Sequence, residues 1–451
     1  MRIIIVGTGT VGSAICTELV EEGHTITVID SNQKTLEDLS NSCDISALYG
    51  NGADISLLRE AGAEKADLLI AVTAQDEVNI LCCLAAKKLG TKNTIARVRN
   101  PEYSELTAIA KDEMGLSFTI NPEYAAARDI SRVLKLPTAT KIDTFCHGKV
   151  ETVEFKVQDG SMLVGKTLHE LRGELDANFL VCGVRRGEEC FIPLGSTVIE
   201  AGDVIAVTAS DENTSRFFKE IKSYKRPVKK LIIFGGGRIT YYLGELLRKS
   251  KTQVTVIEEN KTLCQELAEQ YDWTVIKGNG TKQELLLEEG IESADAFLAL
   301  SELDEENAIT SMFAKTKDVP KIVTMIRSLP YVDFFRSVGL ESIVSPKYST
   351  VSQILRFVRA KADSRASEII SLHRLMDGKI EALEFAIKEE INGLTGTPIR
   401  SIKRKDDTLI ACIIRGDDII IPTGDDEILP ADRVIIVTML QSVDSIKDVL
   451  R

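Results

Sequence analysis

The sequence predicts an α/β protein with two doubly wound parallel-sheet domains, each followed by a small α+β domain. A glycine-rich motif occurs near residue 7 and again near residue 235, and β-branched apolar runs alternate with helix-like patterns after each motif. Short strand-like runs separated by glycine-rich turns follow both regions. Strands that alternate with helices form parallel sheets covered on both faces. We therefore expect four domains in the order A-B-A′-B′.

Composition narrows the class of protein. Of the 451 residues, 44% are hydrophobic and 27% are charged, a balance typical of soluble globular proteins. The 68 acidic residues exceed the 55 basic ones and give a net charge of −13, so we expect no nucleic-acid binding. No apolar run approaches the roughly 18 residues of a membrane span. The N-terminal run is too short for a signal peptide, and we expect a cytoplasmic protein.

Cysteine and histidine give no indication of a metal site. The nine cysteines are scattered without a Cys-x-x-Cys pair, and the four histidines are isolated from one another and from cysteine. This pattern is typical of buried, reduced thiols in a cytosolic protein. We expect no bound metal.

An internal repeat sets the domain organisation. A shift of 228 residues moves Gly7 onto Gly235, and the same shift pairs later residues: Asp30 with Glu258, Asn51-Gly52 with Asn279-Gly280, Asp76 with Asp304, Asn79 with Asn307 and Arg99 with Arg327. A shift of 229 residues moves Ile192-Pro193 onto Ile421-Pro422. We predict domains at residues 1–136, 137–222, 226–362 and 363–451. The basic segment 225–230 is interpreted as a solvated linker.

Periodicity predicts the elements of each module. In module A we expect strands at residues 3–6, 25–29, 47–49, 68–72 and 94–98, and helices at 11–21, 33–40, 55–61 and 77–89. Continuous apolar strands of this kind fit a sheet covered on both faces. In module B we expect short strands at 150–157, 179–185, 189–193 and 204–209.

The first glycine motif has the residues that a dinucleotide needs. Gly7 allows a tight turn after the strand, Gly9 lets a pyrophosphate approach the backbone, and Gly12 lets the helix pack on the strand. The helix N-terminus offers N–H donors to phosphate. Asp30 ends the next strand, where its carboxylate can accept both ribose hydroxyls and repel a 2′-phosphate. We predict NAD or NADH binding; a purely structural glycine turn is the alternative.

Further candidates follow later strands, at the edge where open parallel sheets bind ligands. Asn51-Gly52 is expected beside the adenine, and Thr73-Ala74 under the remaining half of a dinucleotide. Arg97 and Arg99 alternate on one strand. One of them is expected to meet phosphate, or else to pair with a carboxylate.

The second motif, Gly235-Gly236-Gly237-Arg238, departs from the first. Thr240 replaces the third glycine, so we expect helix and strand to lie slightly further apart there. Arg238 can pair with the phosphates of ATP or ADP, and Glu258 keeps the ribose-binding carboxylate. Asn279, Gly280 and Ser301 repeat the later positions. A degenerate site retained for packing is the alternative.

The sequence offers no catalytic residue. A dehydrogenase needs a substrate domain and a positioned acid–base group, and the small β modules show no nucleophile motif or His/Asp pair. We therefore expect the nucleotide to be sensed and not consumed. An NAD-dependent oxidoreductase and a purely structural interaction protein are the competing classes.

The tandem arrangement and its motifs together resemble the TrkA family, whose modules are RCK domains (regulators of potassium conductance) with N- and C-terminal lobes. The resemblance covers essentially the whole chain and rests on residues 3–12 with Asp30, 49–52, 71–77, 97–101 and 121–124. It implies a non-enzymatic homo-oligomer, expected as a tetramer, on the inner face of the cell membrane. Its implied partner is an integral membrane potassium transporter or channel subunit of the Trk type. Regulation of a cation/proton antiporter is an alternative.

The family pattern also implies site residues. In the first site these are Gly7, Thr8, Gly9, Thr10, Val11, Asp30, Asn51, Gly52, Thr73, Ala74 and Arg97. Their counterparts in the second site include Gly235 to Ile239 and Glu258, but Met325 takes the place of Arg97. Helices beginning near Asn121-Pro122 and Ser345-Pro346 resemble the family's crossover helix, which swaps between partner lobes. The resemblance leaves open whether the C-terminal lobes bind a cyclic dinucleotide.

Overall fold

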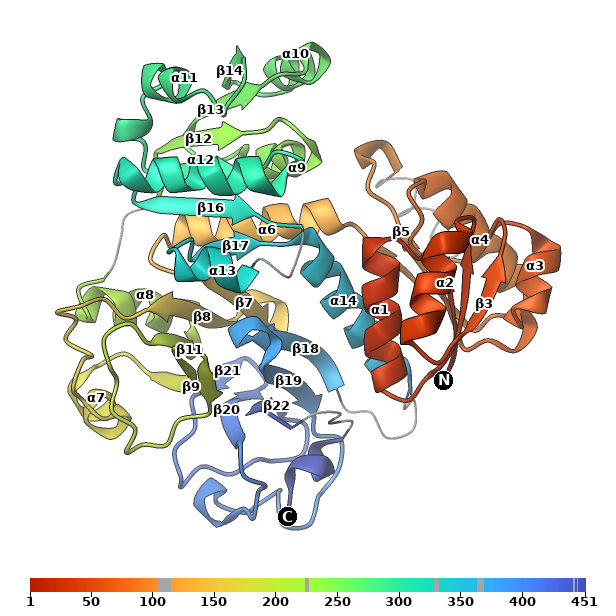
Figure 1. The fold of residues 1–451 in the computed structure, drawn as a ribbon. Coiled ribbons are helices and arrows are strands. Elements are labelled where there is room, and N and C mark those ends of the chain that lie inside the picture. The colour runs from red at the N-terminus through yellow and green to blue at the C-terminus, as the bar shows by residue number, and fades with distance from the viewer. Residues whose placement is uncertain (104–114, 224–226, 328–331, 363–368, 441–442, 444) are drawn as a thin grey trace. The chain divides into compact units, whose positions relative to one another are not determined.

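The computed structural model describes all residues except 104–114, 224–226, 328–331, 363–368, 441–442 and 444 (Figure 1). The described residues form two compact units, and each is described by itself. The first unit contains Met1–Ala127 and Ser345–Val358, and the second contains Arg128–Val344 and Arg359–Arg451. The start of the predicted linker (225–226) and of the predicted fourth domain (363) lie outside the described residues.

The first unit contains a six-stranded parallel sheet with the order β3-β2-β1-β4-β5-β6. Its strands are β1 (Arg2–Val6), β2 (Thr25–Asp30), β3 (Ser46–Tyr49), β4 (Leu68–Ala71), β5 (Asn93–Arg97) and β6 (Phe118–Ile120). Its helices are α1 (Thr10–Glu21), α2 (Gln33–Ser42), α3 (Ile55–Glu60) and α4 (Asp76–Leu89), with a short 3-10 turn η1 (Ala63–Lys65). The order changes direction between β1 and β4, which is where doubly wound sheets bind ligands.

Alternate residues of these strands face opposite layers of helices. Ile3 and Ile5 pack with α1 and α2, whereas Ile4 and Val6 pack with α3 and α4. Both sets are at most 2% exposed, so the sheet is buried on both sides. This explains why its strands are continuous apolar runs.

A helix from far along the chain completes the first unit. Helix α14 (Pro346–Ala362) follows the second parallel sheet in sequence, yet it lies beside α1 (Figure 1). Its apolar side chains belong to the core cluster of the first unit. These side chains are Val351, Ile354, Leu355 and Val358, each at most 4% exposed. Helix α6 (Pro122–Lys135) begins in the first unit and ends in the second. Pro122 and Pro346 begin these helices, where the missing N–H carries no cost.

The second unit contains the repeat of this sheet, with the order β14-β13-β12-β15-β16-β17. Its strands are β12 (Lys230–Phe234), β13 (Gln253–Glu258), β14 (Thr274–Lys277), β15 (Ala296–Ala299), β16 (Lys321–Met325) and β17 (Ser342–Val344). Its helical segments are α9 (Arg238–Leu247), α10 (Lys261–Gln270), α11 (Gln283–Glu288), η3 (Ile291–Ser293), α12 (Asp304–Thr316) and α13 (Val332–Ser337).

Two small antiparallel sheets complete the second unit. We call each sheet with its helices a C-lobe. The sheet of the first C-lobe has the order β10-β9-β11-β8-β7, and the sheet of the second C-lobe has the equivalent order β21-β20-β22-β19-β18. The first is built from β7 (Lys141–Phe145), η2 (Cys146–Gly148), β8 (Val150–Lys156), α7 (Leu168–Glu174), β9 (Phe179–Arg186), β10 (Glu189–Phe191), β11 (Val204–Ser210) and α8 (Asp211–Glu220). The second is built from β18 (Ile369–Leu375), η5 (Met376–Gly378), β19 (Ile380–Ala386), η6 (Ile399–Ser401), β20 (Thr408–Arg415), β21 (Asp418–Ile420), β22 (Arg433–Thr438) and η7 (Ile446–Val449).

The structure confirms the predicted fold class, the predicted strands of both modules and the predicted helices of module A. It adds β6 and β7, whose short runs have weak periodicity, and the helices α7 and α8. All nine cysteines are free thiols, and all but Cys43 and Cys190 are buried. Within the described residues, no helix is long and apolar enough to cross a lipid bilayer.

Candidate nucleotide-binding sites

The first glycine loop has two positions that only glycine can occupy. Gly7 has a φ of +96°, and a Cβ there would lie 2.9 Å from the Thr73 nitrogen. A Cβ on Gly12 would lie 1.8 Å from the Gly7 carbonyl oxygen. A Cβ on Gly9 would meet nothing within 4 Å. Gly7 and Gly12 therefore hold α1 close to the end of β1, as predicted, while Gly9 lies on the open side of the loop.

The N-terminus of α1 lies at this open side. Gly9 is the N-cap residue, and it has no side chain to satisfy the first N–H groups of the helix. Gly9 and Thr10 are exposed, whereas Thr8 and Val11 are buried. Uncapped N–H groups at an exposed helix start can bind a phosphate.

Asp30 lies at the end of β2, beside the loop. One carboxylate oxygen accepts hydrogen bonds from the Thr8 N–H at 2.5 Å and the Thr8 hydroxyl at 2.8 Å. The other oxygen accepts from the Asn32 N–H at 2.8 Å. A carboxylate has about four acceptor positions, so it retains capacity for ribose hydroxyls. Asp30 thus both shapes the loop and presents a half-buried carboxylate next to it.

Asn51 and Gly52 form a turn above the end of β1. The Asn51 side-chain oxygen accepts from the Ala53 N–H at 3.0 Å, and Asn51 is exposed. A Cβ on Gly52 would lie 2.1 Å from Val6 Cγ1. The close contact explains the glycine, because any larger residue would lift the turn from the sheet.

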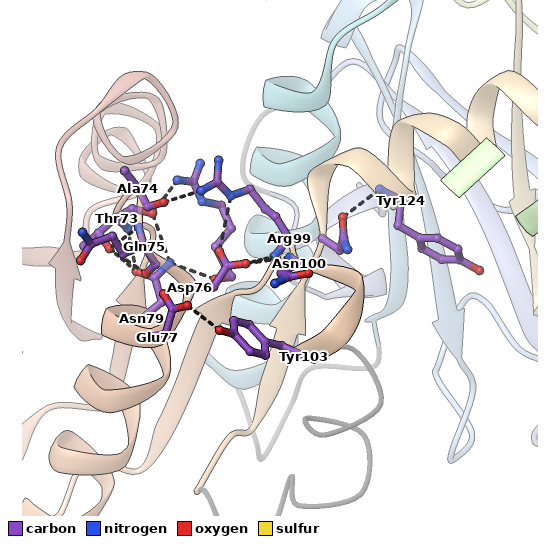
Figure 2. A network of polar contacts seen from close by, with 12 residues as sticks. Thr73, Ala74, Gln75, Asp76, Glu77, Asn79, Arg99, Asn100, Tyr103 and Tyr124 are labelled. Atoms are coloured by element: carbon purple, nitrogen blue, oxygen red, sulfur yellow. Dashed lines mark hydrogen bonds and ion pairs between the residues drawn. The ribbon is translucent and has the colours of Figure 1, made fainter. Parts of the chain in front are cut away.

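Asn79 fixes the ends of β4 and β5 next to the loop (Figure 2). Its side chain is fully buried, and its oxygen accepts from the N–H and the hydroxyl of Thr73, both at 2.8 Å. Its amide nitrogen donates to the carbonyls of Thr73 at 3.2 Å and Arg97 at 2.9 Å. Arg97 in turn donates to the Thr73 carbonyl at 2.5 Å. Thr73 and Arg97 are therefore brought together, as the predicted site requires.

Asp76 and Arg99 form the charge pair that was one of the two expectations for the arginines. Asp76 is 5% exposed, accepts from the Arg99 and Asn100 N–H groups at 2.7 Å, and lies 3.4 Å from Arg99 Nε. Arg99 also donates to the Ala74 carbonyl (Figure 2). Arg99 lies beyond the end of β5, so the two arginines do not share one strand as predicted.

Tyr103 extends this network along α4. Its hydroxyl donates to Glu77 Oε1 at 2.6 Å, and this hydrogen bond lowers the pKa of Glu77 (Figure 2). Sequence reasoning did not assign Asp76, Asn79 or Glu77 to the site. The signal was present, because Asp76 and Asn79 recur as Asp304 and Asn307 in the repeat.

The second glycine loop repeats the geometry with different side chains. Gly235 has a φ of +104°, and Glu258 accepts from the N–H groups of Gly236 and Asn260, both at 2.6 Å. Thr240 is fully buried, and its hydroxyl donates to the Gly235 carbonyl at 2.6 Å. Thr240 thus occupies the position of Gly12 with a side chain that bonds the loop carbonyl, and a wider spacing between α9 and β12 remains a prediction. Arg238 is the first, exposed residue of α9.

The remaining positions of the second site follow the first. A Cβ on Gly280 would lie 2.2 Å from Phe234 Cδ2, and the Asn279 oxygen accepts from the Thr281 N–H at 2.8 Å. Buried Asn307 accepts from the Ser301 N–H at 2.8 Å and donates to the Met325 carbonyl at 3.1 Å. Met325 places an apolar side chain where the first site has Arg97.

Two family models match the chain. The model of the TrkA-N domain matches residues 3–122 and again residues 231–346. These two matches contain the two glycine loops and nearly all of both parallel sheets. The model of the TrkA-C domain matches residues 152–222, which include most of the first C-lobe.

Curated relatives align along almost the whole chain. A Trk system potassium uptake protein TrkA homolog from Archaeoglobus fulgidus is 32% identical over 453 residues, and the alignment covers 100% of this chain and 100% of the relative. The Trk system potassium uptake protein TrkA of Halomonas elongata is 34% identical over 442 residues, with 97% of this chain and 95% of the relative covered.

Solved structures share the fold at lower identity. The GsuK RCK domain is 18% identical with a TM-score of 0.65, covering 97% of this chain and 92% of that one. A GsuK channel bound to NAD has a TM-score of 0.64 at 18% identity, and the match covers 97% of this chain and 76% of the channel chain. A GsuK structure bound to ADP has a TM-score of 0.51 at 15% identity, covering 79% and 68%. These likenesses show a common fold.

Proposed function

Because the chain belongs to the TrkA family, we propose that it is the nucleotide-responsive regulatory subunit of a Trk-type potassium uptake system. It binds NAD or NADH at the first glycine loop and ATP or ADP at the second. Nucleotide occupancy changes its conformation and thereby gates an integral membrane potassium transporter or channel subunit. It acts as a homo-oligomer, expected as a tetramer, at the cytoplasmic face of the membrane.

The observation that carries the proposal is the repeated pairing of an uncapped helix start with a strand-end carboxylate. In the first copy Asp30 accepts from the Thr8 N–H, and in the second Glu258 accepts from the Gly236 N–H. Both loops begin with a glycine of positive φ, and both helices have a glycine as N-cap. Phosphate at the helix start and ribose at the carboxylate are the two contacts that define a nucleotide site in this fold.

The differences between the loops support different ligands. Arg238 places a guanidinium at the start of α9, where Thr10 begins α1. A guanidinium can form two parallel hydrogen bonds to a terminal phosphate of ATP or ADP. Arg97 near Thr73 belongs to the first site alone, because Met325 occupies its place in the second. The GsuK structures bound to NAD and to ADP support both ligand classes in this fold.

The hydrogen bonds around Asn79 support a mechanism in which nucleotide binding changes the conformation of the protein. A dinucleotide whose second half lies over Thr73-Ala74 contacts the segment to which Arg97 and Arg99 donate. Arg99, just beyond the end of β5, links this segment to Asp76 at the start of α4. A ligand that binds one conformation better shifts the population toward it.

The proposal includes binding without turnover. The first site supplies glycines, hydroxyls, an amide, a carboxylate and a guanidinium for recognition. The curated relatives are named as potassium uptake proteins, which fits a regulatory role. A hydride transfer would in addition need a substrate and an acid–base group next to Thr73.

Calorimetric titration with NADH, NAD, ADP and ATP tests the proposal. We expect two unequal sites per chain, with Asp30→Ala weakening NADH binding and Glu258→Ala weakening ATP or ADP binding. Each loss should reach about 1.5–3 kcal/mol, the scale of hydrogen bonds to a charged group. The absorbance of NADH should stay constant with the protein present. Equal binding by the parent and Asp30→Ala would show that the carboxylate does not hold the ribose.

A further inference from the structure

The two C-lobes begin with equivalent elements. A shift of 230 residues places β7 on the last five residues of β18, η2 on η5, and β8 on β19. The strand registers agree, because Asp143 pairs with Thr152 and His373 pairs with Ala382. Cys146 and Met376 occupy the same position and have similar positive φ values of 51° and 48°. The lobes are therefore two copies of one structural unit.

These copies pack on each other through the same face. One apolar core takes side chains from both lobes, including Phe145, Val150 and Cys182 from the first and Leu375, Ile380 and Cys412 from the second. Glu154 accepts from the Met376 N–H at 3.0 Å. Glu384, its equivalent, accepts from the Cys146 thiol at 3.2 Å. Exchange of equivalent contacts shows that an approximate two-fold axis relates the lobes.

Near such an axis a residue meets its own equivalent, and here the equivalents differ. Asp143 and His373 occupy the same position in the two copies, and Asp143 Oδ1 lies 3.0 Å from His373 Nδ1. Their side chains are 17% and 12% exposed. Lys141 lies 2.8 Å from the other Asp143 oxygen, and the His373 ring packs on Phe145 with centroids 4.3 Å apart. The pair thus places a carboxylate against an imidazole nitrogen at a site largely shielded from water.

We propose that Asp143 and His373 determine which lobes pair: a first C-lobe accepts a second C-lobe and rejects another first C-lobe. Pairing of two first lobes would bring two Asp143 carboxylates together in a shielded site, even though each keeps Lys141. Pairing of two second lobes would bring two imidazoles together without a carboxylate at the position of Asp143. Ser371 stands at the position of Lys141 and donates to Glu384 at 2.9 Å. Like groups at a buried contact disfavour the wrong partner. The pair therefore favours a first lobe paired with a second lobe over the pairing of two like lobes.

Reversal of the pair tests this inference in the full-length protein. Asp143→His leaves two histidines at the axis, and His373→Asp leaves two aspartates. We expect each single variant to have a lower thermal midpoint than the parent. The double variant D143H/H373D restores the Asp–His pair with the partners exchanged but loses the contact of Lys141 with Asp143. Its midpoint should therefore lie above those of both single variants.

Mixing the single variants gives a second readout. The first C-lobe of Asp143→His is complementary to the second C-lobe of His373→Asp in another chain. Chains unfolded together and refolded as an equal mixture should have a higher midpoint than either variant refolded alone. Native mass spectrometry should then show assemblies that contain both variants in excess of random mixing.

An exposed pair between the same lobes is the matched control. Lys149 Nζ lies 2.5 Å from Asp417 Oδ1, and the Asp417 side chain is 96% exposed. Asp417→Lys should leave the midpoint and the assembly unchanged. The inference is overturned if the single variants keep the parental midpoint. It is also overturned if D143H/H373D or the refolded mixture is no more stable than the single variants, because complementarity would then not determine pairing.

Discussion

At the scale of single residues, buried polar side chains fix the backbone where the ligand is proposed to bind. Asn79 is fully buried and makes four hydrogen bonds to Thr73 and Arg97. Asp76 binds two consecutive N–H groups beyond β5. In the repeat, Asn307 accepts from the Ser301 N–H and donates to the Met325 carbonyl, and Asp304 accepts from the Arg327 N–H. The site therefore depends on residues that need not touch the nucleotide.

Asn79→Ala should lower both stability and nucleotide affinity. It leaves the Thr73 N–H without its buried acceptor, which costs about 1–3 kcal/mol in the free energy of unfolding. Denaturant unfolding measures this cost, and NADH titration should show weaker binding as the end of β4 loosens. Asn307→Ala is the matched control, because it should cost similar stability and leave the first site intact. Unchanged NADH affinity in Asn79→Ala would separate this residue from the site.

Asp143 should make the second unit sensitive to acid. Burial alone would raise the pKa of Asp143, but Lys141 and His373 hold that pKa below its usual value. A carboxyl whose pKa is lowered by folding stabilises the protein above its unfolded pKa of about 3.9, and this stabilisation is lost as the pH falls.

The comparison of Asp143→Asn with the parent measures that contribution. Thermal midpoints of the two proteins should differ most near neutral pH and converge as the pH falls below about 4. A difference that stays constant over this range would show that the Asp143 charge does not stabilise the fold.

Residue roles were predictable where chain position alone determines them. Gly7, Gly12, Asp30 and Glu258 follow from their spacing after a strand, and the structure places them as expected; that they bind nucleotide remains a prediction. The contacts of Asp76 and Asn79 with the strand ends were not predicted. Both residues lie in the first turn of α4, where a polar residue usually indicates helix capping. Arg99 faces Asp76 because the chain turns after Arg97, which periodicity does not reveal.

At the scale of elements, close backbone contacts decide how α1 meets β1. Gly12 lies against the Gly7 carbonyl, and α9 has a threonine there whose hydroxyl bonds the equivalent carbonyl. The same strand–loop–helix unit thus has a glycine at this contact in the first copy and a hydrogen-bonding threonine in the second.

Gly12→Ala should therefore destabilise the first unit. The added Cβ would lie 1.8 Å from a carbonyl oxygen and must displace the helix, at a cost of about 1–3 kcal/mol. Gly9→Ala is the matched control, because its Cβ meets nothing and its φ of −62° suits alanine. Gly9→Ala should keep stability within about 0.5 kcal/mol and weaken only NADH binding, since it crowds the pyrophosphate. Equal unfolding curves for Gly12→Ala and the parent would contradict this account.

Helix α14 shows where prediction from sequence ended at this scale. Its apolar stripe of Val351, Ile354, Leu355 and Val358 indicates a buried face, but the stripe does not say which sheet the face covers. The crossover resemblance implied a swap, and the structure places this face on the sheet of the first unit.

Leu355→Ala should consequently weaken the first unit. Leu355 is fully buried, and removal of its side chain should cost about 2–5 kcal/mol. Hydrogen exchange resolved by segment should show faster exchange in β1 and β4, far away in sequence. Leu81→Ala on α4, where the side chain is 53% exposed, is the control and should leave exchange unchanged. Altered exchange only in the second unit would place α14 elsewhere.

At the scale of the whole molecule, the internal repeat predicted the A-B-A′-B′ order and the two sheet types. The two compact units nevertheless do not coincide with the four sequence modules. Helix α14 packs in the first unit, and both C-lobes share one core in the second. Such long-range choices depend on which apolar faces meet, and a linear pattern does not specify them. We propose that the side chains at the Asp143 and His373 positions contribute to this choice.

The proposed regulation of potassium transport by nucleotide can be measured as potassium flux into vesicles. These vesicles would contain the Trk-type membrane subunit from the same cells. Flux would be measured with and without this protein, in the presence and absence of NADH and ATP. We predict that nucleotide changes the flux only when this protein is present, and that Asp30→Ala removes the response to NADH and Glu258→Ala the response to ATP. Flux that is the same with and without nucleotide would contradict the proposed regulation, even if both nucleotides bind.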